Sequence, residues 1–278
     1  MHSSGNICKR IAWIAGFFLL STGEVPVRSD VEKALEIRWR FPQERFWEYR
    51  LVQTARIQNY YPSDPEKPDR RSPVHTETTQ GVISLKTLDD GNTYGDIVLE
   101  LKDIREKNQS LLLSEAQKIP QKVCRFIMSA DGTMEQYSGP LKETYIITRL
   151  ILGVPLQRMK LNEVRVFPFS IYTDRDESRS PMTGTISHEL RSLERHDNRS
   201  IAQIVTTIDL VDRSTEGKVI ENTWKGTGTS LFDIDTGCLE TASWSIAQKQ
   251  KLSGTAPEEP NMIVQIFDIT AARSNRSN

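Results

Sequence analysis

The fold is decided by the stretch between Trp224 and Leu252, which begins WKGTGTSLF, turns through DIDTG and continues CLETASWSI. The two arms, Trp224–Phe232 and Cys238–Ile246, are rich in Thr, Trp and aliphatic residues, which favour strands. The segment 233–237 between them begins with aspartate and ends with glycine, two residues that suit tight turns. The stretch therefore predicts one long antiparallel β-hairpin.

One face of this hairpin combines aromatic rings with glycine. If Phe232 opposes Cys238, the pairs that follow on that face are Ser230 with Glu240, Gly228 with Ala242, Gly226 with Trp244, and Trp224 with Ile246. Glycine inside a strand favours a bend or a close approach to the backbone. A Trp244 ring over Gly226 would cover that backbone. We therefore predict a strongly curved sheet at this hairpin.

The concave side of such a sheet would carry five candidate ligand-binding residues, Trp224, Gly226, Gly228, Trp244 and Ile246. Two interpretations of this face stay open. It is a packed core, as buried aromatic side chains usually are, or it is an apolar groove that holds a ligand.

Alternating apolar and polar residues predict further hairpins along the chain. The segment 35–41 alternates apolar with charged residues, and Trp47 to Ile57 continues as the second arm. The remaining expectations are hairpins at 81–103, 123–136 and 185–210, a bent or edge strand at 164–172 around Pro168, and a last strand at 262–270. The expected fold class is mainly β, a curved antiparallel sheet that forms an open barrel or a sandwich.

One α-helix is expected to pack on this sheet. The helix is predicted over 140–154, because its apolar residues Ile147, Leu150, Ile151 and Val154 share one helical face. Pro140 suits its first turn and Pro155 ends it.

The segments on either side of this helix, 34–137 and 164–270, contain similar hairpins. The first begins GVIS at 81–84 and the second GTIS at 184–187. The match is short, and it hints at two similar halves within one β-rich domain.

The N-terminus has the pattern of an export signal. Lys9 and Arg10 precede an apolar run at 11–20, and small residues follow at 21–23. This pattern predicts a signal peptide over 1–23. The alternative is an uncleaved membrane anchor, although the run is shorter than the roughly 20 residues that span a bilayer.

The exported chain would then be a single β-rich domain over 24–270 with a disordered tail over 271–278. Its expected location is the periplasm or the outside of the cell. The sequence carries 36 Lys and Arg against 37 Asp and Glu, so it offers no basic surface for nucleic acid.

Two cysteines lie outside the signal, Cys124 and Cys238, both on faces predicted to be buried. Exported proteins often pair such cysteines, and free buried thiols are also common, so both outcomes stay open. His75, His188 and His196 lack the spacing of metal ligands and are expected at the surface or at hairpin ends. We expect no metal and no cofactor.

No catalytic motif stands out in the chain. It has no Gly-x-Ser-x-Gly elbow, phosphate loop or dinucleotide fingerprint. The pattern Asp233-x-Asp235-x-Gly237 is too short for a calcium loop and predicts a tight turn stabilised by aspartate side chains. We therefore expect a protein that is not an enzyme.

The pattern Gly226-x-Gly228, Phe232-Asp233 and Gly237-x-Leu239, preceded by the strand Ile204–Leu210, resembles a group of uncharacterised bacterial exported β-rich proteins. The resemblance covers residues 34–252 in pattern. In architecture the chain is also similar to the lipoprotein and lipid carriers of bacterial envelopes, in which a curved sheet wraps an apolar cavity. That resemblance implies a lipid or acyl-chain ligand and no catalysis.

The first hypothesis is therefore a non-enzymatic envelope protein that binds an apolar ligand or lipid on the concave face of its sheet. The alternative is a structural or protein-interaction module of the envelope, with a fully packed core and an envelope protein as its partner. An exported hydrolase comes third, and it would require polar groups that converge in a cleft.

Overall fold

The computed structural model describes residues 34–41, 46–61, 75–90, 94–108, 117–118, 120, 122–138, 150–152, 158–171, 182–196, 198–212, 219–256 and 259–274. All of these residues belong to one compact unit, Lys33–Asn278. The predicted signal peptide at 1–23 lies outside the described residues. In the described part of the chain, no helix is long and apolar enough to cross a membrane.

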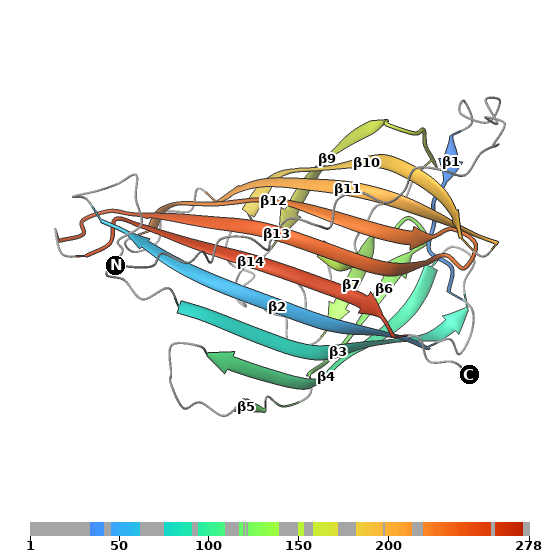
Figure 1. Ribbon diagram of the computed structural model, residues 1–278, viewed down its shortest axis with the longest axis horizontal. Coiled ribbons are helices and arrows are strands. Elements are labelled where there is room, and N and C mark those ends of the chain that lie inside the picture. The colour runs from blue at the N-terminus through green and yellow to red at the C-terminus, as the bar shows by residue number, and fades with distance from the viewer. Residues whose placement is uncertain are drawn as a thin grey trace, which may run out of the picture. The chain divides into compact units, whose positions relative to one another are not determined.

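The protein is mainly β, as predicted, and its long strands form one antiparallel sheet of 12 strands (Figure 1). The strand order is β7-β6-β4-β3-β2-β14-β13-β12-β11-β10-β9, and the short β5 pairs with β4. The bounds are β2 Phe46–Tyr60, β3 His75–Asp90, β4 Tyr94–Asn108, β5 Gln117–Lys118, β6 Lys122–Ser129, β7 Met134–Ser138, β9 Val164–Ile171, β10 Met182–His196, β11 Arg199–Asp212, β12 Val219–Asp233, β13 Cys238–Leu252 and β14 Met262–Arg273. A separate two-stranded sheet joins β1, Leu35–Glu36, to β8, Arg158–Met159.

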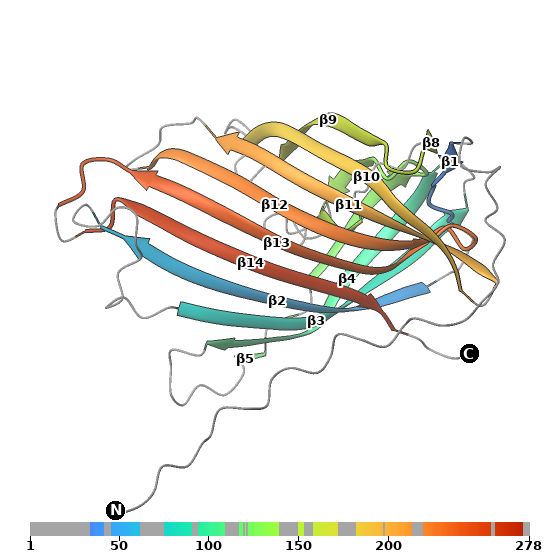
Figure 2. The same ribbon diagram turned by 45° about the horizontal axis from the view of Figure 1, so that its top comes forward.

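The sheet is a meander in which almost every strand pairs with its neighbours in sequence. The one long-range pairing joins β14 to β2, where Phe267 lies opposite Ala55 (Figure 2). No ladder joins β7 to β9 among the described residues. All the long strands thus belong to a single open sheet rather than to the two sheets of a sandwich.

The hairpin of β12 and β13 forms as predicted, but its register is wrong by two residues. Gly228 pairs with Trp244 and Gly226 with Ile246, whereas Trp224 lies opposite Gln248. The turn is one residue tighter than expected, since Asp233 pairs with Cys238, and a bulge beside Phe232 adds the second residue of the shift. Beyond the bulge, the shift of two leaves the side chains on their predicted face. On the turn side the shift is one, so Leu239 rather than Cys238 lies opposite Phe232.

A short segment that is not part of the sheet crosses one end of it. Residues 35–41 were predicted to form a hairpin with the strand at 47–57, and this prediction is wrong. Only Leu35–Glu36 enters a ladder, with β8, and residues 37–41 form the strap. Its predicted alternation is nevertheless confirmed, because Ile37, Trp39 and Phe41 are almost completely buried. The Trp39 ring packs edge-on against Phe232 with ring centroids 5.2 Å apart.

The strap joins two turns that lie far apart in the strand order. The Trp39 N–H donates to the carbonyl of Ala130, after β6, at 2.9 Å, and the Arg40 N–H donates to the carbonyl of Gly237, before β13, at 3.0 Å. Because consecutive residues are joined by one peptide unit, these carbonyls lie within about 10 Å of each other. Five strand spacings in a flat sheet would separate them by about 24 Å. The sheet is therefore bent at this end.

The apolar core lies on one side of this sheet and draws on both halves of the chain. Strands β2, β3, β4 and β6 supply buried residues such as Tyr49, Leu85, Leu99 and Phe126. Strands β10 to β14 supply a second set on the same continuous cluster. That the two halves are similar to each other remains a prediction.

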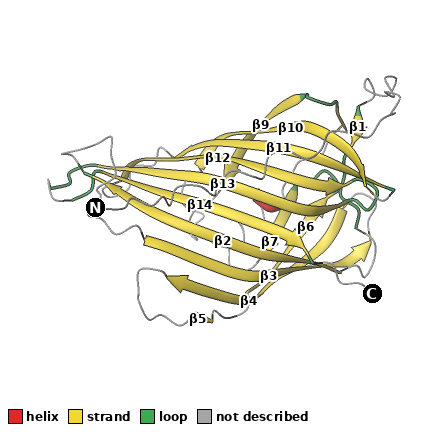
Figure 3. Cartoon of the chain, in the orientation of Figure 1, coloured by secondary structure: helices red, strands yellow, loops and turns green. Residues whose placement is uncertain are grey.

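The predicted helix at 140–154 falls largely outside the described residues. Of that segment only Leu150–Leu152 are described, with helical backbone at Leu150 and Ile151 (Figure 3). All three side chains are buried in the core. The helix itself therefore stays a prediction.

The C-terminal boundary needs a correction. The tail was predicted to begin at residue 271, yet β14 continues to Arg273, and Ala271 and Ala272 pair with both neighbouring strands. Ala271 lies on the apolar face, which explains why the strand extends past Thr270. Residues 275–278 lie outside the described part of the chain.

The strap contact predicts a difference between two glycines. Gly237 and Gly254 both have positive φ, 65° and 63°, so alanine strains each backbone alike. A Cβ at Gly237 would also meet the backbone nitrogen of Arg40 at 2.8 Å, whereas nothing lies within 4 Å at Gly254. In chemical denaturation, we expect Gly254→Ala to cost about 1 kcal/mol and Gly237→Ala to cost about 1–3 kcal/mol more. Equal losses would show that the strap does not press on this turn.

Candidate ligand-binding face

The five predicted site residues lie together on one side of β12 and β13. We call this side of the sheet, from β10 to β14, the inner face. Trp224, Trp244 and Ile246 are 6%, 4% and 2% exposed, and all three belong to the apolar core. Gly226 and Gly228 follow Trp224 on the same face of β12. The structure thus brings the predicted residues onto one surface, and their binding of a ligand stays a prediction.

Small side chains surround the Trp244 ring on this face. A Cβ at Gly228 would collide with the indole ring of Trp244, so the ring lies directly against the glycine backbone. Trp244, which was predicted to lie over Gly226, therefore lies over Gly228. On the turn side of the ring, Ser230, Ala242 and Ala271 form one row across β12, β13 and β14. Only glycine at position 228 lets the indole lie this close to the sheet.

A central row of side chains crosses the inner face through Trp244. Paired residues on adjacent strands place His188 of β10, Thr206 of β11, Gly228 of β12 and Trp244 of β13 side by side. His188 was expected at the surface or at a hairpin end, and this expectation is wrong, because the residue is 1% exposed. Its position between Ile186 and Leu190 in the alternation was the signal that could have placed it inside.

The burial of His188 keeps its imidazole neutral. Desolvation lowers the pKa of His188 from its ordinary 6.5 to about 4. Its Nδ1 atom lies 2.9 Å from the Thr206 hydroxyl, and its ring centroid lies 5.9 Å from that of Phe167. His188 therefore contributes a polar but uncharged group to the inner face.

Several buried polar atoms of the inner face have no hydrogen-bond partner among the residues that the structure describes. They are the indole nitrogens of Trp224 and Trp244, the hydroxyl of Ser230 and Nε2 of His188. Buried polar groups are almost always hydrogen-bonded, and an unsatisfied one costs about 1–3 kcal/mol. The four atoms lie on β10, β12 and β13, and Trp39, Tyr49 and Thr87 elsewhere in the described core also carry a buried polar atom without a partner.

The same region of the inner face carries no charge. In the described strands, the inward residues between Gly184 and Leu190, Ala202 and Leu210, Trp224 and Phe232, and Ala242 and Gln248 are all uncharged. The charged residue closest in the central row is Arg165 on β9, opposite His188. Its guanidinium is ion-paired with Glu163 at 2.8 Å.

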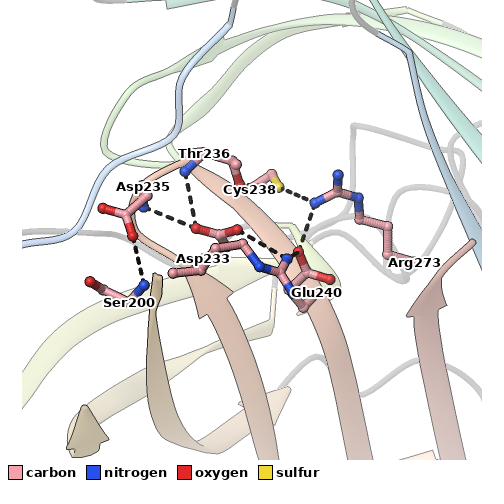
Figure 4. Close-up of polar contacts among 8 residues, drawn as sticks. Ser200, Asp233, Asp235, Thr236, Cys238, Glu240 and Arg273 are labelled. Carbon is pink, nitrogen blue, oxygen red and sulfur yellow. Dashed lines mark hydrogen bonds and ion pairs between the residues drawn. The ribbon is translucent and has the colours of Figure 1, made fainter. Parts of the chain in front are cut away.

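A second polar cluster lies at the β12–β13 turn (Figure 4). The fully buried Asp233 carboxylate accepts hydrogen bonds from the backbone N–H groups of Asp235 and Thr236, both at 3.0 Å. This confirms the predicted aspartate-stabilised turn. The Arg40 side chain of the strap donates to the carbonyl of Asp235 at 2.8 Å and fastens the strap to it. Among the described residues, no three His, Cys, Asp or Glu side chains are placed to hold a metal ion.

Two arginines tie this turn to the neighbouring strands. Arg199 lies 3.4 Å from Asp233 and 3.1 Å from Glu240, while Arg273 at the end of β14 donates to Glu240 at 2.7 Å. Figure 4 shows Arg273 reaching from β14 toward Cys238 and Glu240. The charges balance within the cluster, which gives it a structural role.

Cys124 and Cys238 do not form a disulfide in the structure, which corresponds to the second alternative left open by the sequence, buried cysteines without a disulfide. Neither sulfur is bonded to another cysteine, and both side chains are buried, at 2% and 0% exposure. Cys238 instead lies 3.0 Å from the Thr236 hydroxyl and 2.9 Å from the Arg273 guanidinium. Burial raises the pKa of Cys238, although Thr236 and Arg273 oppose the shift. A protonated buried thiol is a poor nucleophile.

No protein-family model matches the chain, and no curated protein matches it. Among solved structures, it is similar to lipovitellin, from a structure concerned with lipid–protein interactions, with a TM-score of 0.46 and 9% identity over 84% of this chain and 25% of that one. It is also similar to DynF from the dynemicin biosynthesis pathway of Micromonospora chersina, with a TM-score of 0.25 and 7% identity over 92% of both chains. The chain thus spans a quarter of the lipovitellin chain. Both TM-scores are too low to support an argument about function.

The neutral His188 predicts a pH dependence of stability. Below its ordinary pKa of 6.5 the unfolded histidine binds a proton, whereas the folded one stays neutral until about pH 4. Stability therefore falls as the pH drops through this window, by on the order of 3 kcal/mol in total. Chemical denaturation of wild type and His188→Leu between pH 6.5 and about pH 4 checks this prediction. The free energy of unfolding should fall less with decreasing pH in the variant. Parallel curves would mean that His188 is not held neutral by burial.

Two hydroxyls of the inner face predict opposite effects on stability. Ser230→Ala removes a buried hydroxyl that has no partner, so the free energy of unfolding should stay the same or rise by up to about 1 kcal/mol. Thr206→Val removes the partner of His188 with almost no change in shape, and should cost about 1–3 kcal/mol. Chemical denaturation gives the free energy of unfolding of each variant relative to wild type. A clear loss in Ser230→Ala would show that its hydroxyl is satisfied in solution.

Proposed function

We propose that the chain is a non-enzymatic protein, exported to the cell envelope, that binds an apolar ligand or lipid on the inner face of its sheet. The observation that carries the proposal is the combination on one face of buried aromatic and aliphatic side chains with polar atoms that no described residue satisfies. The export pattern at residues 1–23 supports the location in the periplasm or outside the cell.

The inner face has the composition of a small-molecule site. Such sites are lined mostly by apolar and aromatic side chains, with a few polar groups that orient the ligand. Trp224, Trp244 and Ile246 supply the apolar part, and Ser230 and His188 supply polar atoms. Gly228 lets the Trp244 ring lie against the backbone of β12, and Gly226 lies against Ile246.

The titratable groups near this face favour binding over catalysis. His188 contacts a hydroxyl rather than a carboxylate, and burial lowers its pKa to about 4, away from that of an effective general base at neutral pH. Cys238 contacts Arg273 and Thr236, and burial raises the pKa of its thiol. Neither arrangement resembles the nucleophile-and-base pair of a hydrolase.

One observation favours the alternative, a structural or protein-interaction module with a packed core. The protein itself buries Trp224, Trp244 and Ile246 almost completely. The outward side chains of the edge strand β9 include Val164 and Val166, which are 58% and 61% exposed. An exposed apolar edge of this kind suits a contact with another envelope protein.

A matched pair of leucine substitutions on β13 separates the two functions. Ala242 faces inward beside Trp244, and Ser243 next to it is exposed on the opposite face. If a ligand binds there, Ala242→Leu competes with it for space. Native mass spectrometry of protein purified from its own envelope should then show a lipid-sized adduct on wild type and Ser243→Leu and much less on Ala242→Leu, with little loss of stability.

The packed module gives the opposite result. Without a ligand, an inward leucine overfills the core and costs about 1–3 kcal/mol, whereas Ser243→Leu costs little. A bare mass for all three proteins, together with a destabilised Ala242→Leu, would contradict the binding proposal and direct the search to protein partners.

A further inference from the structure

We infer that the ligand of the inner face is an elongated neutral lipid that carries a hydrogen-bond acceptor such as an ester or ketone carbonyl, rather than a fatty-acid anion or a plain hydrocarbon. This inference rests on the proposed function and narrows it to a chemical class. It follows from the kind of polar atoms left over, from the absence of charge around them and from their spacing.

The unpartnered atoms are mainly hydrogen-bond donors. The indole nitrogens of Trp224 and Trp244 can only donate. The Ser230 hydroxyl can donate or accept, and Nε2 of His188 donates when the Thr206 hydroxyl donates to Nδ1. A ligand that satisfies these groups must therefore bring acceptors.

The surroundings of these donors exclude a buried charge. Transfer of a carboxylate into an apolar site without a countercharge is very unfavourable. His188 is neutral, and the inward residues around Trp244 on the described strands carry no cation. Arg165, which faces His188 from the edge strand, already pairs with Glu163. A carbonyl oxygen of an ester or ketone accepts hydrogen bonds without this penalty.

The donors are also spread along the strands. Trp224 and Ser230 lie six residues apart on the same face of β12, a distance of about 20 Å. Trp244 lies between them, opposite Gly228, and His188 lies on the third strand from it. A compact ligand could reach only one end of this set. A molecule with a long chain and more than one acceptor along it matches the spacing.

The test compares three probes with the same number of carbon atoms: hexadecyl acetate, octadecanoic acid and octadecane. Each displaces Nile red from the full-length, lipid-extracted protein at about pH 8, where the acid is ionised. We expect the ester to bind about tenfold more tightly than the alkane and at least about a hundredfold more tightly than the acid. An acid that binds as tightly as the ester, or an alkane that does so, would overturn the inference and leave the proposed function intact. If none of the probes binds, the proposed function itself fails.

Trp244→Phe tests the donor directly. The ring is kept in outline while its N–H is lost, so the preference for ester over alkane should fall about threefold to tenfold. A general defect in the site would weaken both probes alike and leave their ratio unchanged. If the acid is the best ligand and Arg165→Gln abolishes its binding, the site instead selects an anion at the edge strand.

Discussion

Two backbone hydrogen bonds from neighbouring residues hold the bent end of this sheet. Trp39 binds the turn after β6 and Arg40 binds the turn before β13, so one short strap joins places that a flat sheet would keep far apart. The rest of the structure depends on this constraint. It brings the apolar residues of the first half toward those of the second, and it explains why both sets belong to one core.

The inner face that results combines two properties that are seldom found together. Its aromatic and aliphatic side chains are buried as in a packed core, yet four of its polar atoms lack partners in the described part of the chain. A core that served stability alone would replace Ser230 and the two indoles by apolar residues of similar volume, because unsatisfied donors are costly. Their presence is the physical reason to regard this face as a site for a ligand with acceptor atoms.

The sequence predicted much of the local structure. Hairpins were expected at 81–103, 123–136, 185–210 and 224–252, and each corresponds to a pair of adjacent strands in the sheet. The period-two alternation also placed Trp224, Trp244 and Ile246 on the same buried face. The register of the last hairpin was missed, because a tighter turn and a bulge each moved it by one residue. Alternation fixes which face a side chain occupies but not which residue lies opposite it.

By itself, the sequence determined most of the long strands, four of their antiparallel hairpins and the buried face of β12 and β13, because these depend on neighbours along the chain. The tertiary structure decided the rest. Only the sheet order places His188 and Thr206 beside Gly228 and Trp244, and only the fold leaves Cys124 and Cys238 apart with other partners. The strap likewise meets Ala130 and Gly237 through contacts between distant segments. Such contacts are set by how the sheet bends, and no periodicity in the sequence encodes that bend.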